Sequence, residues 1–201
     1  MLEYLLIGTG YAFAAAWQPG PFQAFLLSRV AAAGWRRTLP AALAPLISDG
    51  PIAVLILAVL RSVPDSFETS LRAFGGLVLL FFAWRAWRQW RQEGSEREAS
   101  PVSAPRTVWQ ATLVNAVNPG PWLGWSLIMG PMTIEAWRLS AGHAVALVGG
   151  FYVTMTANLL ALIVLMGTTG RLRPERRRVL HLLTVAALAA LGLWRLFTAL
   201  L

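Results

Sequence analysis

Two Pro-Gly-Pro segments interrupt long apolar stretches of the chain, and polar residues stand beside both of them. Pro19-Gly20-Pro21 follows Gln18, and Pro119-Gly120-Pro121 follows Asn118 at the matching place 100 positions later. Because proline removes a backbone N–H and clashes with the carbonyl four residues earlier, a helix through either segment must bend or break. A break at membrane depth survives only where it is buried in protein or lines a cavity, so both segments are candidate binding sites. The alternative is a pair of kinks that only shape helix packing.

The chemistry that such breaks offer suits a zwitterion. The carbonyl end of a half-helix attracts an ammonium or another cation, and the N-terminus of the half-helix that resumes attracts a carboxylate. The prolines would free the carbonyls of the residues four positions earlier, which are Ala15, Trp17, Asn115 and Val117. We expect a small zwitterionic substrate to contact Gln18, Pro19, Gly20, Pro21, Asp49, Asn115, Asn118, Pro119, Gly120, Pro121 and Asn158. Three tryptophans near the breaks would either line this cavity or pack in the core: Trp17, Trp122 and Trp125.

Asp49 is the one acid inside any of the expected membrane spans. Ionising a carboxyl in lipid is costly, so its side chain should face the protein interior. We expect Asp49 either to carry a coupling proton or to hold the amine of the substrate. The alternative is a local role, in which its carboxyl satisfies backbone that Pro45 or Pro51 frees in the same span. Asn158 would be a neutral counterpart of Asp49 in the second half of the chain.

The composition places these residues in a membrane protein. Of all residues, 57% are hydrophobic and 13% are charged, whereas soluble domains typically carry about 25% charged residues. All 17 basic residues are Arg. They lie between apolar runs rather than together on one basic face, which argues against a nucleic-acid partner. With no Cys and only two His, neither a metal site nor a cofactor is expected.

Six apolar stretches are long enough to cross a bilayer as helices, which takes about 20 residues. We expect an all-α integral membrane protein with six transmembrane helices, over 4–28, 38–60, 69–90, 108–133, 142–168 and 178–200. The third has the shortest uncharged core, and we expect Arg85 and Arg88 to snorkel there beside tryptophans. Most Arg residues fall in the first, third and fifth connections. The positive-inside rule then places these connections in the cytoplasm and both termini outside.

The repeated break predicts two related halves. Trp84-Arg85 also recurs, as Trp194-Arg195. The stretch 92–107 is charged and rich in Ser and Pro, which is typical of a linker in solvent. We therefore expect a first three-helix repeat over 1–91, a cytoplasmic linker over 92–107 and a second repeat over 108–201. Because each half has an odd number of spans, the halves would insert in opposite orientations, as in many secondary transporters.

The chain resembles the LysE/RhtB family of bacterial amino-acid exporters. The features that carry the resemblance are Pro19-Gly20-Pro21 in the first span, Asp49 in the second, Asn118-Pro119 in the fourth, and six spans in 201 residues. The resemblance implies efflux of amino acids or their derivatives across the bacterial inner membrane, coupled to an ion gradient. It also implies a role for the matching residues. The lysine that usually follows Asn-Pro in the family is Gly120 here, which leaves the substrate open.

These observations favour a secondary transporter that works by alternating access, not an enzyme. The alternatives are another cargo such as a metal ion or a lipid precursor, a membrane-embedded enzyme, and a scaffold subunit. A hard cation would need more carboxylates than Asp49 alone provides. An enzyme would have only Asp49, His143 and His181 for acid–base chemistry, and these are scattered. The expected partners are the lipid bilayer and, through small residues such as Ala186 and Ala190, a second copy in a homodimer.

Overall fold

The described part of the chain is entirely helical. The structure, a computed structural model, describes residues 1–18, 20–62, 68–91, 107–169 and 174–200. Its α-helices are α1 (Leu2–Trp17), α2 (Pro21–Ala33), α3 (Trp35–Thr38), α4 (Ala44–Leu60), α5 (Glu68–Arg91), α6 (Thr107–Val117), α7 (Pro119–Gly124), α8 (Gly130–Leu139), α9 (Ala141–Thr169) and α10 (Pro174–Leu200). A 3-10 turn, η1 (Leu39–Leu43), precedes α4, and a π-helical turn, η3 (Trp125–Met129), precedes α8.

Both Pro-Gly-Pro segments break a helix, as the sequence predicts. α1 ends at Trp17 and α2 begins at Pro21, with Gln18 and Gly20 in extended backbone between them. Pro19 lies outside the described residues. α6 ends at Val117, and α7 begins at Pro119 directly after the extended Asn118. Each proline that starts a half-helix stands in its first turn, where the N–H that proline lacks would have no helical partner in any case.

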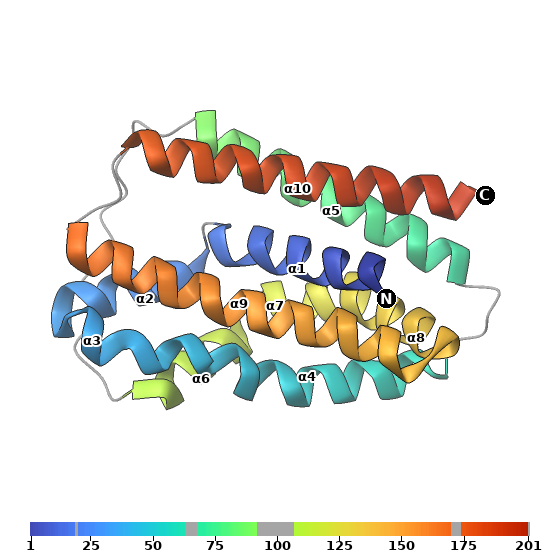
Figure 1. Ribbon diagram of the computed structural model, residues 1–201, viewed down its shortest axis with the longest axis horizontal. Coiled ribbons are helices and arrows are strands. Elements are labelled where there is room, and N and C mark those ends of the chain that lie inside the picture. The colour runs from blue at the N-terminus through green and yellow to red at the C-terminus, as the bar shows by residue number, and fades with distance from the viewer. Residues whose placement is uncertain (19, 63–67, 92–106, 170–173, 201) are drawn as a thin grey trace.

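Two pairs of long helices make the most extensive contacts (Figure 1). α1 packs along α9 and α5 packs along α10; α1 also contacts α10, α8 contacts α9, and the shorter α6 contacts α4. Small residues allow the backbones of α5 and α10 to approach closely. A Cβ built on Gly76 of α5 would lie 3.0 Å from the carbonyl oxygen of Gly192 in α10, and the reverse distance is also 3.0 Å. Such glycine contacts are the usual means of close helix packing in membranes.

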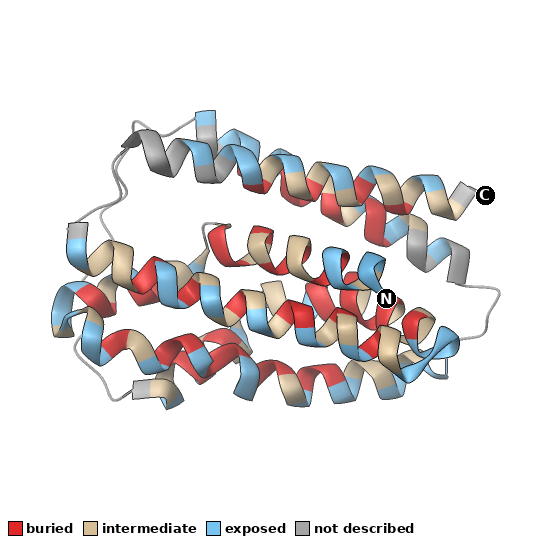
Figure 2. Ribbon diagram, in the orientation of Figure 1, coloured by how far each residue is buried: buried red, intermediate tan, exposed pale blue. Residues whose placement is uncertain are grey.

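The outer surface suits a lipid environment. Figure 2 shows exposed residues along the outer edges of α4 and α10 and buried residues along the edges that face the other helices. Large apolar side chains lie on that outer surface, with Val54, Val153 and Phe197 more than 60% exposed. Among the described helices, three are long and apolar enough to cross a membrane by length and composition: Trp35–Leu60, Ala141–Thr168 and Leu182–Ala199. The chain is therefore a membrane protein.

The structure agrees with one expectation about an individual helix and differs from another. The third expected span, 69–90, is part of one continuous helix, α5, as expected. The fourth expected span, 108–133, ends too early. In the structure α8 continues to Leu139 and contains Glu135. Glu135 thus lies in a helix beyond the end of the expected span, and it accepts a hydrogen bond from buried Arg195 of α10 at 2.9 Å. Pairing of the two charges lets the helix continue where the apolar pattern stops. The expected linker, 92–107, lies outside the described residues except for Thr107.

Candidate functional site

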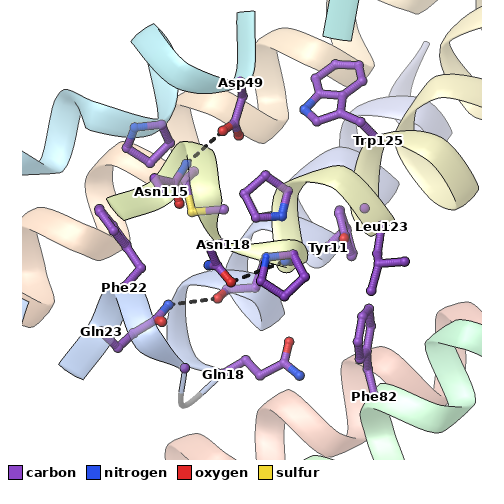
Figure 3. A pocket seen from close by; sticks show the side chains of 18 of the residues that line it. Tyr11, Gln18, Phe22, Gln23, Asp49, Phe82, Asn115, Asn118, Leu123 and Trp125 are labelled. Atoms are coloured by element: carbon purple, nitrogen blue, oxygen red, sulfur yellow. Dashed lines mark hydrogen bonds between the residues drawn. The ribbon is translucent and has the colours of Figure 1, made fainter. Parts of the chain in front are cut away.

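A pocket lies between the two helix breaks. Its volume is about 190 Å³, which suits a small solute, since drug-sized ligands occupy pockets of about 300–1,000 Å³. Of the residues expected to bind substrate, those that line it are Gln18, Gly20, Pro21, Asp49, Asn115, Asn118, Pro119, Gly120 and Pro121. They come from α4, from α6 and from the segments around both breaks (Figure 3). Residues that are 100 positions apart in the sequence therefore meet at one cavity.

Asp49 lies on the α4 side of the pocket and is 3% exposed. Its Oδ1 accepts a hydrogen bond from Asn115 Nδ2 of α6 at 2.8 Å, and the Ser48 hydroxyl lies within hydrogen-bonding distance at 3.2 Å. Both contacts go to Oδ1, so neither donor engages Oδ2, and the Trp125 indole also interacts with this carboxyl. None of these contacts is to the backbone, so the geometry does not favour the local role considered for this carboxyl. One oxygen of Asp49 remains available to a proton or an ammonium.

At the first break, Gln23 folds back onto the end of α1. Its Nε2 donates to the carbonyl oxygens of Ala15 at 3.2 Å and Ala16 at 3.1 Å. The carbonyl of Ala15 is one of those that the sequence predicts to be freed by proline. It therefore has a donor within the protein, and the end of α1 is less open to a cation than the sequence suggests. Gln23 also lines the pocket (Figure 3).

At the second break, side chains and backbone satisfy the helix ends in a comparable way. Asn118 Oδ1 accepts the Gly120 N–H at 3.2 Å, which is an N-cap for α7. Trp122 Nε1 donates to the Ala116 carbonyl at 2.7 Å, so a side chain beyond the break returns to the end of α6. The Asn115 carbonyl, also predicted to be freed, accepts from the Asn118 N–H at 3.2 Å. Polar groups of the protein thus hold both breaks in place.

Asn158 does not line the pocket. Its Oδ1 accepts the Trp17 indole N–H at 2.7 Å, and its Nδ2 donates to the Thr154 carbonyl at 2.8 Å. Trp17 is the last residue of α1, and Asn158 lies in α9. Asn158, the expected counterpart of Asp49, therefore makes a comparable contact. Each of the two accepts a hydrogen bond from a side chain of the helix that precedes a break, Trp17 for Asn158 and Asn115 for Asp49. The amide of Asn158 is occupied by protein groups.

Several lining residues have no local feature in the sequence that points to a binding site. Aromatic and apolar side chains make up much of the wall, among them Tyr11, Phe22, Phe82, Met129, Phe151 and Met155. Arg85, expected to snorkel toward the membrane surface, also lines the pocket from α5. Asp49 and Arg85 are the one acid and the one base among the described lining residues. For Gln23 the sequence does offer a signal, because an amide side chain shortly after a Pro-Gly-Pro break can donate to the carbonyls that the break frees.

Of the three tryptophans considered for the cavity wall, only Trp125 is among the described lining residues. Trp17 is buried against Asn158, and Trp122 is 38% exposed while bonded to Ala116. The resulting cavity combines one acid, one base, neutral amides and an aromatic wall. This is the composition of a site that binds a small polar molecule through a few directed groups and encloses its apolar part.

One kind of comparison with known proteins gives a match. No curated protein and no solved structure matches the chain. The model of the LysE type translocator family matches residues 13–196, which include both breaks and every residue assigned above to the pocket apart from Tyr11. The chain belongs to the LysE type translocator family.

Proposed function

We propose that the protein is a secondary transporter that exports amino acids or amino-acid derivatives across the bacterial inner membrane. The observation that carries the proposal is the pocket in which both helix breaks meet the buried carboxyl of Asp49. Membership of a translocator family supports transport, and export in particular comes from that likeness. A zwitterion suits the pocket because an acid, a base and neutral amides line it together.

The helix pairing supports an inverted repeat of six spans. If the halves are related by a two-fold axis, the first span corresponds to the fourth, the second to the fifth and the third to the sixth. The pair α1–α9 then maps onto the pair α6–α4, and α5–α10 maps onto itself. The same two-fold axis would relate the hydrogen bond from Trp17 to Asn158 to the hydrogen bond from Asn115 to Asp49. Both termini lie outside the cell in this proposal, because the Arg-rich connections face the cytoplasm.

Asp49 gives the transporter a way to couple export to a proton gradient. Its Oδ2 can hold a proton or the ammonium of the substrate, and a single oxygen cannot serve both at once. Substrate binding from the cytoplasm would then release the proton, and protonation from outside would release the substrate. Rocking of the two halves about the pocket would expose the site to each side in turn. The exchange of one ligand for the other makes the protein an antiporter.

Two other cargoes fit the pocket less well. A hard metal cation prefers six or more oxygen ligands with several carboxylates, and Asp49 is the one acid of the described lining. A lipid precursor carries a long apolar chain that exceeds a cavity of about 190 Å³. An enzyme would need a second acid–base group near Asp49, and beside Asp49 the described lining supplies Arg85 as its one other charged side chain. A scaffold subunit would not need a polar pocket between its halves.

The test is transport by the purified protein in liposomes with an acidic interior. Uptake of each of the twenty amino acids is measured with and without the pH gradient, and empty liposomes serve as the control. We expect at least one amino acid to accumulate only when the gradient is present. If no amino acid or amino-acid derivative is accumulated or exchanged, the proposed cargo is wrong.

A further inference from the structure

Trp125 has a buried polar group without a well-formed hydrogen bond. Its side chain is 2% exposed, and its Nε1 makes no hydrogen bond of good geometry in the described part of the chain, although it interacts with the nearby Asp49 carboxyl and Tyr152 hydroxyl. Buried donors are paired in the great majority of cases, so an unpaired one requires an explanation. The other two tryptophans near the breaks have paired indoles, since Trp17 donates to Asn158 and Trp122 donates to Ala116, each at 2.7 Å. The unpaired N–H is therefore a specific property of Trp125 among the three.

The local backbone and the surrounding rings fix the position of this indole. Trp125 begins the π-helical turn η3, a rare form of helix that is frequent at functional sites. Its ring lies edge-on to Phe151 and at a tilt to Tyr152, with centroid distances of 6.4 Å in both cases. Such packing restricts rotation of the side chain. The unpaired N–H is thus held in one direction.

That direction is toward the pocket and Asp49. Trp125 lines the pocket, and Figure 3 shows its indole nitrogen on the edge of the ring that faces the Asp49 carboxyl. A donor that needs an acceptor therefore stands beside an acid whose Oδ2 is engaged by neither Asn115 nor Ser48. In an α-amino acid, an ammonium that donates hydrogen bonds lies next to a carboxylate that accepts them. The N–H suits the carboxylate, and the Asp49 oxygen suits the ammonium.

We propose that Trp125 is a substrate-binding residue whose indole N–H donates to the carboxylate of the transported amino acid, while Asp49 Oδ2 accepts from its ammonium. This inference rests on the proposed function. It makes Trp125 a determinant of specificity, because an amine without a carboxylate would leave the buried N–H unpaired. A site that is built to bond a polar group discriminates strongly against an analogue that lacks it.

The test compares Trp125→Phe with the matched variant Trp17→Phe. Binding to the purified protein is measured by calorimetry for the twenty amino acids, and then for the amine formed by decarboxylating the one that binds best. We expect Trp125→Phe to weaken amino-acid binding by about 10- to 100-fold, which corresponds to loss of a hydrogen bond to a charged group. Affinity for the amine should not change. The melting temperature should fall less than that of Trp17→Phe, because both variants lose the same ring volume from a buried site but Trp125→Phe loses no hydrogen bond of good geometry within the protein.

Trp17→Phe should give the opposite pattern. It removes a bond to Asn158 and should lower the melting temperature, while amino-acid binding is retained. If the parent protein binds an amino acid and Trp125→Phe binds it equally well, the role assigned to Trp125 is wrong and the proposed function stands. If Trp125→Phe weakens the amine and the amino acid alike, the residue acts on the shape of the pocket and the role is also wrong. If no amino acid binds to the parent, the proposed function fails and this inference fails with it.

Discussion

Asn115 of α6 and Asp49 of α4 are joined by a hydrogen bond of 2.8 Å between Nδ2 and Oδ1. Both side chains are buried, at 4% and 3% exposed, and both line the pocket. The bond connects two residues that are 66 positions apart and that belong to different halves of the chain. It fixes the orientation of the carboxyl, so that the second oxygen is the one left for a proton or a ligand.

We expect this bond to stabilise the folded protein measurably. Asn115→Leu leaves Asp49 Oδ1 without its closest donor, and the melting temperature in detergent should fall. Hydrogen bonds to charged groups contribute about 1.5–3 kcal/mol. In the double variant with Asp49→Leu, both partners are apolar, and the loss should be smaller than the sum of the single losses. Additive losses would show that the two side chains do not interact in the folded protein.

Gln23 should be important for the stability of the first break. Gln23→Leu removes the donor to the Ala15 and Ala16 carbonyls, and a buried carbonyl without a partner costs about 1–3 kcal/mol. We expect a clear drop in melting temperature. Gln18→Leu is the matched control, because Gln18 lines the pocket without bonding to these carbonyls. Equal melting temperatures for the Gln23 variant and the parent would contradict the capping role.

Pro21→Ala and Pro121→Ala test whether the breaks themselves matter for transport. Alanine permits a helical N–H where proline has none, so each half-helix can extend across its break. We expect the variants to insert into the membrane and to transport more slowly than the parent, singly and together. Initial uptake rates in liposomes, corrected for the amount of inserted protein, measure this effect. Parent rates in both single variants and in the double variant would mean that the breaks only shape packing.

The sequence predicts the parts of the site that depend on local chemistry. A Pro-Gly-Pro segment cannot continue a helix, and an acid in an apolar stretch must face the interior, so the breaks and Asp49 follow from residue types alone. The direction of a side chain around its helix depends on how distant helices pack, which the sequence does not display. The pairing of Gln23 with the end of α1 and the place of Arg85 in the pocket are therefore visible only in the structure.

Glu135 shows the same limit for the fold. Hydropathy ends the fourth expected span before this residue, because a carboxyl lowers the average of any window that contains it. The partner that neutralises it, Arg195, lies 60 positions later in α10. Only the packing of α8 near α10 shows that the two charges meet, so the helix extends further than the hydropathy predicts.

The most direct test of the account is gradient-driven transport by Asp49→Asn. Asparagine keeps the size of the side chain and removes the group that takes a proton or pairs with an ammonium, and loss of an intramembrane carboxyl should not impair insertion. Glu3→Gln is the control, since Glu3 is an exposed acid in the first turn of α1. In liposomes with an acidic interior, the parent and Glu3→Gln should accumulate the amino acid, and Asp49→Asn should not. A well-folded Asp49→Asn protein that concentrates the amino acid as the parent does would contradict this prediction.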